Sequence, residues 1–539
     1  MLSERETLWL ITATFLVLLM QCGFLLLEGG RVRAKNSINV AQKNVTDLIV
    51  SWAMFFIVGF FVMFGVAPPL GDAAAPTAMG LSPLHFLFHM AFCATAASIV
   101  SGGVAERMSF RGYLVVTILI SALVYPLAGR LTWGDAYDPA NIAWLAELGF
   151  IDFAGATVVH GVGAACALAC AIILGPRLGR FDDQGRALPM PAYNSVLSLA
   201  GVLILMIGWL GFNGGGLAPD DPRLAGVMTN TMTAAAFGGL AGLIVGAMLD
   251  RGTFLPSRTC NGIIGGLVAI TACAHLASTM DAAMLGIVGG AVACFGAEWL
   301  LTRARIDDPV DVVATHGLAG IAGTLGLALV APLDALPAGG RLAQLGVQAF
   351  GSACILGLTA AATGVTLKVF ARFAGVRVSP DAEIVGLNLS EHGEGTGTDR
   401  LQRILADRVE QFGKVDTPIE IDANDEHSEL AGVMSRLMQK YDDAKQCLDA
   451  SEQRFRQFAG TASDWLFETD IHLNVTYFNG ARSVSADRSL TPLLDLLGVS
   501  EDQRAHVASC LEARTATGTF EAAIRMGPDA DGERAVEVR

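Results

Sequence analysis

The chain has 539 residues, of which 53% belong to the hydrophobic set and only 16% are charged. A soluble domain carries about 25% charged residues, so the composition excludes a compact soluble enzyme. The formal charge of −15 is uneven, because residues 1–378 hold 20 basic and 21 acidic residues, whereas residues 379–539 hold 16 and 30. We therefore expect a lipid-buried part followed by an acidic, water-exposed part. The acidic balance argues against nucleic acid as a partner.

Eleven apolar segments are long enough to cross a bilayer, which requires about 20 residues per helix. They lie at residues 8–28, 45–66, 84–105, 112–130, 153–175, 193–213, 226–249, 260–276, 282–302, 310–331 and 347–371. The first segment has no net positive leader and no small-residue cleavage site, so we expect a retained span. The predicted fold class is an all-α polytopic membrane protein with 11 transmembrane helices.

Basic residues are concentrated in the loops that follow odd-numbered spans. Those loops hold 13 Lys and Arg, whereas the N-terminus and the other loops hold only Arg5, Arg130, Arg223 and Arg341. Because positive charge stays in the cytoplasm, we expect the N-terminus outside and the C-terminus inside. The expected location is a bacterial-type inner (plasma) membrane, with the acidic tail in the cytoplasm.

The fifth and tenth spans begin with the same pattern. Asp152 is followed after seven residues by His160-Gly161, and Asp308 is followed after seven residues by His316-Gly317. The two spans run in opposite directions, so the pattern predicts an inverted 5+5 repeat. Each Asp lies where a helix N-cap is expected. A rise of about 1.5 Å per residue carries each His roughly 12 Å along its helix, to the middle of a core about 30 Å thick.

A buried ionisable residue in lipid is costly and is a candidate functional residue. A histidine can also serve as a hydrogen-bonded packing residue between helices, but two in equivalent repeat positions favour function. Neutral imidazoles offer one donor and one acceptor, so His160 and His316 could hydrogen-bond each other and line a narrow apolar pore for ammonia or a proton. No carboxylate cluster accompanies them, so we expect no metal. We also expect no cofactor and no enzymatic activity, since no nucleophile–base pair is visible.

Further motifs surround these histidines. They are Asp152-Phe153-Ala154-Gly155-x-Thr157-Val158-Val159-His160, His316-Gly317-x-x-Gly320, Phe92 with Ile99-Val100-x-Gly102-x-x-x-Glu106-Arg107, Gly208-Trp209-x-Gly211-Phe212-Asn213-Gly214-Gly215, Asn261-Gly262-x-x-x-Gly266-Leu267-Val268-Ala269-Ile270-Thr271, and Gly386-Leu387-Asn388-Leu389-Ser390-Glu391-His392-Gly393-Glu394. Over residues 6–395 the chain resembles the Amt/Mep/Rh ammonium transporter family. The resemblance implies a homotrimer with one pore per subunit, ammonium or ammonia as substrate, and methylammonium as an analogue. A regulator of the PII type is not assumed, because a long tail is fused at the cytoplasmic face.

The resemblance also implies roles for residues at the outer end of the pore. Phe92 resembles an outer phenyl gate, whose ring also attracts a cation. By alignment on Thr233-Ala234-Ala235-Ala236, Met228 stands where a second gate phenylalanine is expected. Trp133 resembles the indole of an external ammonium site. Trp144 is an alternative, because the segment between Trp133 and Asp152 is longer than expected.

Deeper residues complete the set that the resemblance implies. Asp152 resembles the carboxylate that organises the external site and biases it toward a cation. His160 and His316 resemble the twin pore histidines. Arg130 is expected near the external site, where its charge would oppose ammonium binding.

The tail predicts a cytoplasmic helix and an α/β module. Residues 1–378 form the predicted membrane domain, and residues 379–425 a tail with the family motif and a linker. Residues 426–450 form a connector helix whose apolar stripe fits either a coiled coil or a helix lying on its own domain. Residues 451–539 resemble a PAS-like sensory domain, with strands expected at 465–470, 473–479, 521–526 and 534–539. A PAS fold should need another strand, so we expect either a chain that continues past residue 539 or an incomplete domain.

Two functions follow, with one further alternative. The favoured hypothesis is an ammonium transporter/sensor that is coupled to a cytoplasmic signalling tail, with a signalling partner or an output domain. The second is a plain ammonium transporter with a regulatory tail. The further alternative is a receptor that does not conduct.

Overall fold

The computed structural model describes residues 2–69, 82–138, 140–395, 428–461, 467–469, 475–478, 520–524 and 534–538. The chain divides into two units, residues 1–403 and 404–539.

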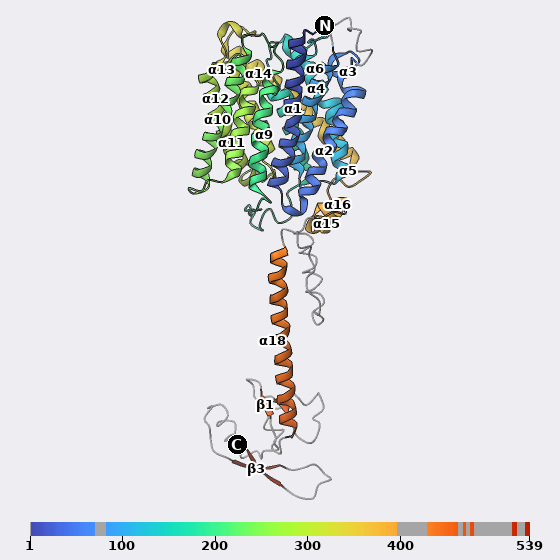
Figure 1. The fold of residues 1–539 in the computed structure, drawn as a ribbon, viewed down its shortest axis with the longest axis vertical. Helices are drawn as coiled ribbons and strands as arrows, with labels where there is room; N and C mark the ends of the chain where they lie inside the picture. Colours follow the sequence, from blue (N-terminus) through green and yellow to red (C-terminus); the bar gives the residue numbers. More distant parts are fainter. Residues whose placement is uncertain are drawn as a thin grey trace. The chain divides into compact units, whose positions relative to one another are not determined.

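The first unit is a bundle of helices that run between two faces (Figure 1). In chain order its elements are α1 (Glu4–Arg31), η1 (Ala34–Asn36), α2 (Ser37–Met54), η2 (Phe55–Gly59), α3 (Phe60–Phe64), α4 (Pro83–Val104), α5 (Phe110–Leu119), η3 (Ile120–Val124), α6 (Tyr125–Trp133), α7 (Trp144–Glu147), η4 (Ala156–Gly161), α8 (Val162–Leu174), α9 (Ser195–Gly214), α10 (Leu224–Leu249), α11 (Pro256–Thr271), α12 (Thr279–Thr302), η5 (Val313–Leu318), α13 (Ala319–Val330), η6 (Leu333–Ala335), α14 (Arg341–Phe370), α15 (Pro380–Val385) and α16 (Leu387–His392). We call the end that carries the start of α1 the N-terminal face. The end that carries α15 and α16 is the tail face.

Ten helical stretches among the described residues are long and apolar enough to cross a membrane. They coincide with ten of the eleven predicted spans. The remaining segment contains α11, whose 16 residues are fewer than a full crossing requires. An eleventh span at α11 therefore stays a prediction. The ten other candidate spans are enough for a multi-pass membrane protein.

The distribution of side chains is that of a protein in lipid. Large apolar residues such as Leu8, Val196 and Leu342 are exposed, whereas Glu28, Lys43 and many other polar residues are fully buried. Hydrocarbon favours apolar side chains on the outside, and buried polar groups then need partners in the bundle. Small residues let the helices approach closely. A Cβ on Gly262 of α11 would lie 2.4 Å from the carbonyl oxygen of Gly238 on α10.

Two π-helical turns carry the two predicted histidines. His160 lies on η4 just before α8, and His316 lies on η5 just before α13. π-helical turns are rare and occur frequently at functional sites. The same local distortion therefore occurs in both halves of the predicted repeat.

The second unit contains one long helix and four short strands. Helix α18 spans Ser428–Thr461, so it continues beyond residue 450, where the connector helix was predicted to end. The strands are β1 (Phe467–Thr469), β2 (Val475–Phe478), β3 (Phe520–Ile524) and β4 (Arg534–Val538). They overlap the four predicted strand segments and form two antiparallel pairs, β1 with β2 and β3 with β4. The PAS-like fold itself stays a prediction, because most of residues 462–539 lie outside the described part.

Candidate functional site

The two histidines meet in the interior of the first unit. The Nδ1 atoms of His160 and His316 are 3.2 Å apart, and the ring centroids are 5.2 Å apart with an interplanar angle of 27°. One imidazole must therefore donate and the other accept. Both rings are buried, and the Nε2 atom of His160 has no hydrogen-bond partner among the described residues.

Aromatic rings enclose this pair. Trp209 stacks on His160 with centroids 4.9 Å apart and an angle of 18°, and the ring of Phe24 lies 6.2 Å from that of His316. Phe212 lies 5.2 Å from His160 and stacks on Phe92 at 4.1 Å and 10°. The rings Phe92, Phe212, His160 and His316 form a continuous column, which we call the ring column.

Phe212, and not Met228, is the ring that packs against Phe92. Met228 is half-buried on α10 and lines a separate open hollow with Leu210, Met232 and Phe237. The alignment that selected Met228 therefore chose a residue away from the ring column. The sequence motif around Trp209 already contained Phe212, but only the tertiary arrangement of the helices brings its ring over that of Phe92.

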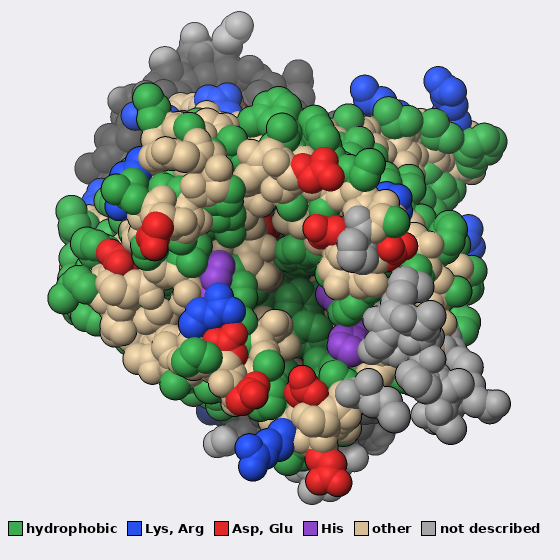
Figure 2. Space-filling view, turned by 90° about the horizontal axis from the view of Figure 1, so that it is seen from above, with side chains coloured by type: hydrophobic (Ala, Val, Ile, Leu, Met, Phe, Trp, Pro, Cys, Tyr) green, Lys and Arg blue, Asp and Glu red, His purple; other side chains and the backbone are tan. Residues whose placement is uncertain are grey.

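A cavity of about 480 Å³ opens at the N-terminal face above the ring column. Figure 2 views this face and shows a hollow with a hydrophobic floor, surrounded by acidic, basic and histidine side chains. The described residues that line the cavity include Trp9, Phe88, Phe92, Trp133, Tyr137, Phe153 and Phe212, together with Glu6 and Asp135. No Lys or Arg is among the described residues that line it. The cavity thus combines aromatic faces with negative charge.

Trp133, and not Trp144, lies at this cavity. The indole Nε1 of Trp133 donates to the backbone carbonyl of Asp152 at 2.8 Å. Trp144 is 43% exposed and packs edge-on against Phe350, outside the cavity. Arg130 is not a lining residue either, since its guanidinium donates to Asn141 and to the carbonyl of Val62. Arg130 therefore does not contact the cavity, and the structure gives no direct contact through which it would repel a bound cation.

The carboxylate of Asp152 accepts hydrogen bonds from the backbone at the start of η4. Its Oδ1 accepts from the amides of Gly155 and Ala156 at 3.1 and 2.8 Å, and its Oδ2 accepts from those of Thr157 and Val158 at 2.9 Å each. Burial raises the pKa of this carboxyl, and the four amides oppose that rise. Asp152 is buried and does not line the cavity, so it organises the site by holding η4 and the indole of Trp133.

Asp308 is the counterpart of Asp152 at the start of η5. Its Oδ2 accepts from the amide of Val313 at 2.7 Å, as expected for a capping carboxylate. Burial raises the pKa of Asp308 to about 7, and its Oδ1 has no partner among the described residues. Asp152 and Asp308 therefore both cap the turns that follow them, but the carboxylate of Asp152 is more completely hydrogen-bonded than that of Asp308.

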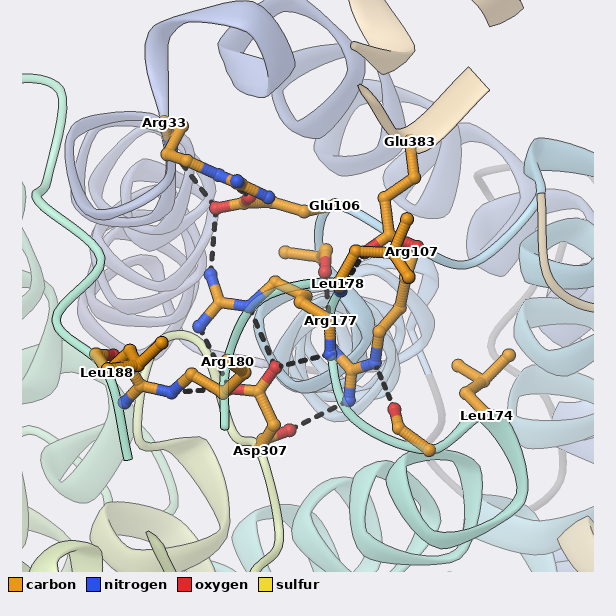
Figure 3. A network of polar contacts seen from close by, with 12 residues as sticks. Arg33, Glu106, Arg107, Leu174, Arg177, Leu178, Arg180, Leu188, Asp307 and Glu383 are labelled. Atoms are coloured by element: carbon orange, nitrogen blue, oxygen red, sulfur yellow. Dashed lines mark hydrogen bonds and ion pairs between the residues drawn. The ribbon is translucent and has the colours of Figure 1, made fainter. Parts of the chain in front are cut away.

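A buried ionic network lies toward the tail face (Figure 3). Glu106 accepts from Arg177 at 2.8 Å and from Arg33, and Arg177 also contacts Asp307 at 2.8 Å. Arg180 lies 3.3 Å from the same Asp307. Burial would raise the pKa values of Glu106 and Asp307, but the neighbouring guanidinium groups outweigh burial and lower both. Sequence reasoning used Glu106 only as part of a motif and missed this network.

The tail segment, residues 379–395, is hydrogen-bonded to the bundle close to this network. Glu383 of α15 accepts from the amide of Leu178 at 2.6 Å and pairs with Arg377 at 2.8 Å. Asn388 of α16 accepts from the amide of Asn39 at 3.0 Å, and Glu391 accepts from the amide of Phe110 at 2.9 Å. Residues 379–395 therefore belong to the first unit.

Comparisons with known proteins agree with this geometry. A sequence profile described as the Ammonium Transporter Family matches residues 8–396. A Synechocystis sp. protein named for ammonium transport is 43% identical over 361 residues, which cover 65% of this chain and 66% of that relative. The ammonium transporter Amt2 of Archaeoglobus fulgidus is 37% identical over 60% of this chain and 71% of its own length. The chain thus spans about two thirds of the length of these relatives.

A solved structure titled "Sensor Amt Protein" is similar over 72% of this chain and 98% of its own, with a TM-score of 0.69 and 36% identity. The profile match covers well over half of the chain. The chain therefore belongs to the ammonium transporter family.

Proposed function

We propose that this chain binds ammonium in the cavity at its N-terminal face and passes ammonia inward along an apolar path between Phe92 and the histidine pair. The proton that ammonium releases is relayed inward by the two imidazoles, so that one net charge crosses with each ammonia. The observation that carries the proposal is the direct contact of His160 with His316 below a closed aromatic stack. Family membership supplies the substrate class.

The cavity suits a small cation. Aromatic faces attract ammonium-type cations, and carboxylates without a lining Lys or Arg give the cavity a negative potential. Trp133 contributes an indole face whose position is fixed by its hydrogen bond to the carbonyl of Asp152. Ammonium is therefore concentrated next to Phe92 before it enters the path.

The ring column selects what passes. The rings of Phe92 and Phe212 are 4.1 Å apart, so one of them must move to admit even a small molecule. An apolar constriction offers Na⁺ and K⁺ no replacement for their hydration shells and excludes them. The imidazole pair offers both donor and acceptor capacity, which suits ammonia or the transfer of a proton.

We place this chain in an inner (plasma) membrane with its N-terminal face outside and its tail face in the cytoplasm. Arg33, Arg107, Arg177 and Arg180 lie in one region with Glu383 of α15, the helix that marks the tail face (Figure 3), which supports this orientation under the positive-inside rule. We also infer a homotrimer with one path per subunit, from the family alone.

The test is ammonium-evoked current in liposomes that hold the purified full chain. A saturating current that is lost in a His160→Ala/His316→Ala variant supports the proposal. The matched control is His392→Ala. It removes an imidazole of the tail segment whose Nε2 contacts the side-chain amide of Asn39. A current that survives loss of both pore imidazoles would contradict the proposed path.

A second function, sensing, is favoured by one observation. The tail segment, residues 379–395, hydrogen-bonds Leu178, Asn39 and Phe110 of the bundle, so a change in the bundle has a direct route to the tail. We propose that the connector helix and the PAS-like region carry such a signal to a cytoplasmic partner or output domain. Saturable ammonium binding by calorimetry without current would favour a receptor over a transporter. An unchanged current after deletion of residues 404–539 would favour a plain transporter.

A further inference from the structure

Helix α18 carries a regular apolar stripe within the acidic part of the chain. The stripe is a series of positions, spaced alternately by four and three residues, that runs from residue 430 to residue 455. It holds six large apolar residues, namely Leu430, Met434, Leu437, Tyr441, Leu448 and Phe455. Ala444 and Ser451 fill its two remaining positions. Apart from the half-buried Met434, the large side chains are 53–68% exposed, so the described residues leave the stripe largely uncovered. A continuous exposed apolar surface of this kind marks an interaction site.

The spacing of the stripe indicates the kind of partner that covers it. Positions four and three residues apart are the d and a positions of a heptad, which in a coiled coil pack against the same positions of a neighbouring helix. A straight α-helix drifts about 20° per heptad from a strict seven-residue repeat, which amounts to roughly 70° between residues 430 and 455. The stripe therefore stays in line with its partner only when α18 supercoils around another helix.

The positions that flank the stripe distinguish a coiled coil from a helix that lies on its own domain. A helix that covers a globular core has a wider apolar face, which also includes e or g positions. From residue 440 onward, the e and g positions of α18 hold Lys440, Lys445, Cys447, Glu452 and Arg454. The b, c and f positions between residues 430 and 455 hold only polar or small residues. Of the two alternatives for the connector helix, this narrow stripe favours the coiled coil.

We propose that α18 forms a parallel, in-register coiled coil with α18 of another copy of this chain. Another copy fits because it presents the identical stripe, so that each position packs against the same position of its partner. The small layers at Ala444 and Ser451 then make room for the rings of Tyr441 and Phe455. Copies that share one membrane orientation begin their α18 helices on the same side of the bilayer, so the parallel direction requires no reversal of the chain. This pairing involves the second unit alone, and it holds whether or not the first unit conducts ammonium.

The first test is disulfide cross-linking of the purified full chain in a Cys447→Ser background, which removes the exposed native thiol of α18. Leu430→Cys and Phe455→Cys place a thiol at either end of the stripe, whereas Gln439→Cys and Gln453→Cys place one on the opposite face. Because a disulfide requires Cα atoms within about 7 Å, the stripe variants should form covalent dimers about tenfold faster than the opposite-face variants. An antiparallel coil would hold the two like thiols at opposite ends. Equal rates on the two faces, or cross-links at neither end of the stripe, would therefore overturn the proposal.

An exchange of charges tests the register. In a parallel coil a g position faces the e position five residues later in the partner, so Lys440 of one copy would lie beside Lys445 of the other. Lys445→Glu replaces this repulsion by an ion pair, and it should speed the cross-linking of Leu430→Cys about threefold, as expected for an exposed pair. Lys440→Glu should do the same. The double variant restores like charges and should lose the gain, and a gain that persists there would contradict the proposed register.

A disrupted stripe separates the coil from any contact that the first unit makes. Leu437→Asp with Leu448→Asp places like charges within the stripe and should abolish the faster cross-linking of Phe455→Cys. The matched control, Gln439→Asp with Gln446→Asp, adds the same charges to the opposite face and should leave that cross-linking intact. Thermal unfolding of the first unit should be unchanged in both. Equally fast cross-linking in the two variants would refute the coil. A chain that cross-links along the stripe but carries no ammonium current would refute the proposed transport and keep the coil.

Discussion

Replacing Asp152 should unfold the pore-lining turn and should not merely remove a charge from a binding site. The carboxylate accepts four backbone hydrogen bonds of 2.8–3.1 Å from residues 155–158, and it is buried. Hydrogen bonds to a charged group contribute about 1.5–3 kcal/mol each. Asp152→Asn keeps one acceptor oxygen and places an amide group against two of the donors, so it loses about two bonds, or about 3–6 kcal/mol.

Asp152→Ala loses all four bonds, which is comparable with a typical total stability of about 5–15 kcal/mol. With an unfolding entropy of about 2.1 cal/mol/K per residue over the first unit, the Asn variant should melt about 4–7 °C below the wild type. The Ala variant should give little folded protein.

Thermal unfolding in detergent, followed by intrinsic tryptophan fluorescence, measures this effect. Asp182→Asn is the matched control, because Asp182 also accepts backbone bonds, from Gln184 and Arg186, in an exposed loop. It should shift the melting temperature by little. An Asp152→Ala variant as stable as Asp182→Asn would refute the reasoning and return Asp152 to a purely electrostatic role.

Three further predictions concern the gate, the tail segment and acid stability. Phe212→Ala should change ammonium current or its selectivity strongly, because it removes half of the ring stack, whereas Met228→Ala should leave currents near wild type. Similar ammonium currents in the two variants would contradict the role of Phe212 in the ring stack. A chain ending at residue 403 should melt like the full chain, whereas one that also lacks residues 379–395 should melt lower, since α15 and α16 hydrogen-bond the loops of the bundle. Equal melting temperatures would argue against that docking. Because Arg177 lowers the pKa of Asp307, the stability from this carboxylate is present above its unfolded pKa of about 3.9 and is lost only as pH falls through a lower folded value. Melting temperature should therefore drop below about pH 4, and less steeply in Asp307→Asn, in a pH series of thermal scans.

The sequence by itself determined the class of protein and the identity of its central residues. Hydropathy alone located the apolar helices, because the bilayer imposes a fixed length and an apolar surface on each span. The repeated spacing from Asp152 to His160 and from Asp308 to His316 selected two imidazoles that lie in direct contact. A short-range pattern of this kind survives folding, since it depends only on the rise of a helix.

The sequence was less informative wherever a role depends on the packing of distant helices. It contained Phe212 within a motif but assigned the second ring to Met228, and it left Trp133 and Trp144 as alternatives. Which ring faces which neighbour depends on helix rotation and crossing, and one residue of register turns a side chain by about 100°. The stacking of Phe212 on Phe92 decided the first question, and the hydrogen bond from Trp133 to the carbonyl of Asp152 decided the second.

The tertiary structure alone also revealed the ionic network of Glu106, Arg177 and Asp307. These residues lie on three loops far apart in the chain, so no local pattern predicts their contact. Glu106 has a backbone φ of 70°, which is uncommon for a residue with a side chain and is held in place by its ion pairs. Periodicity and spacing therefore determine the helices and the histidine pair. Long-range packing decides the ring column, the lining of the cavity and the attachment of the tail segment, because those contacts exist only after the helices assemble.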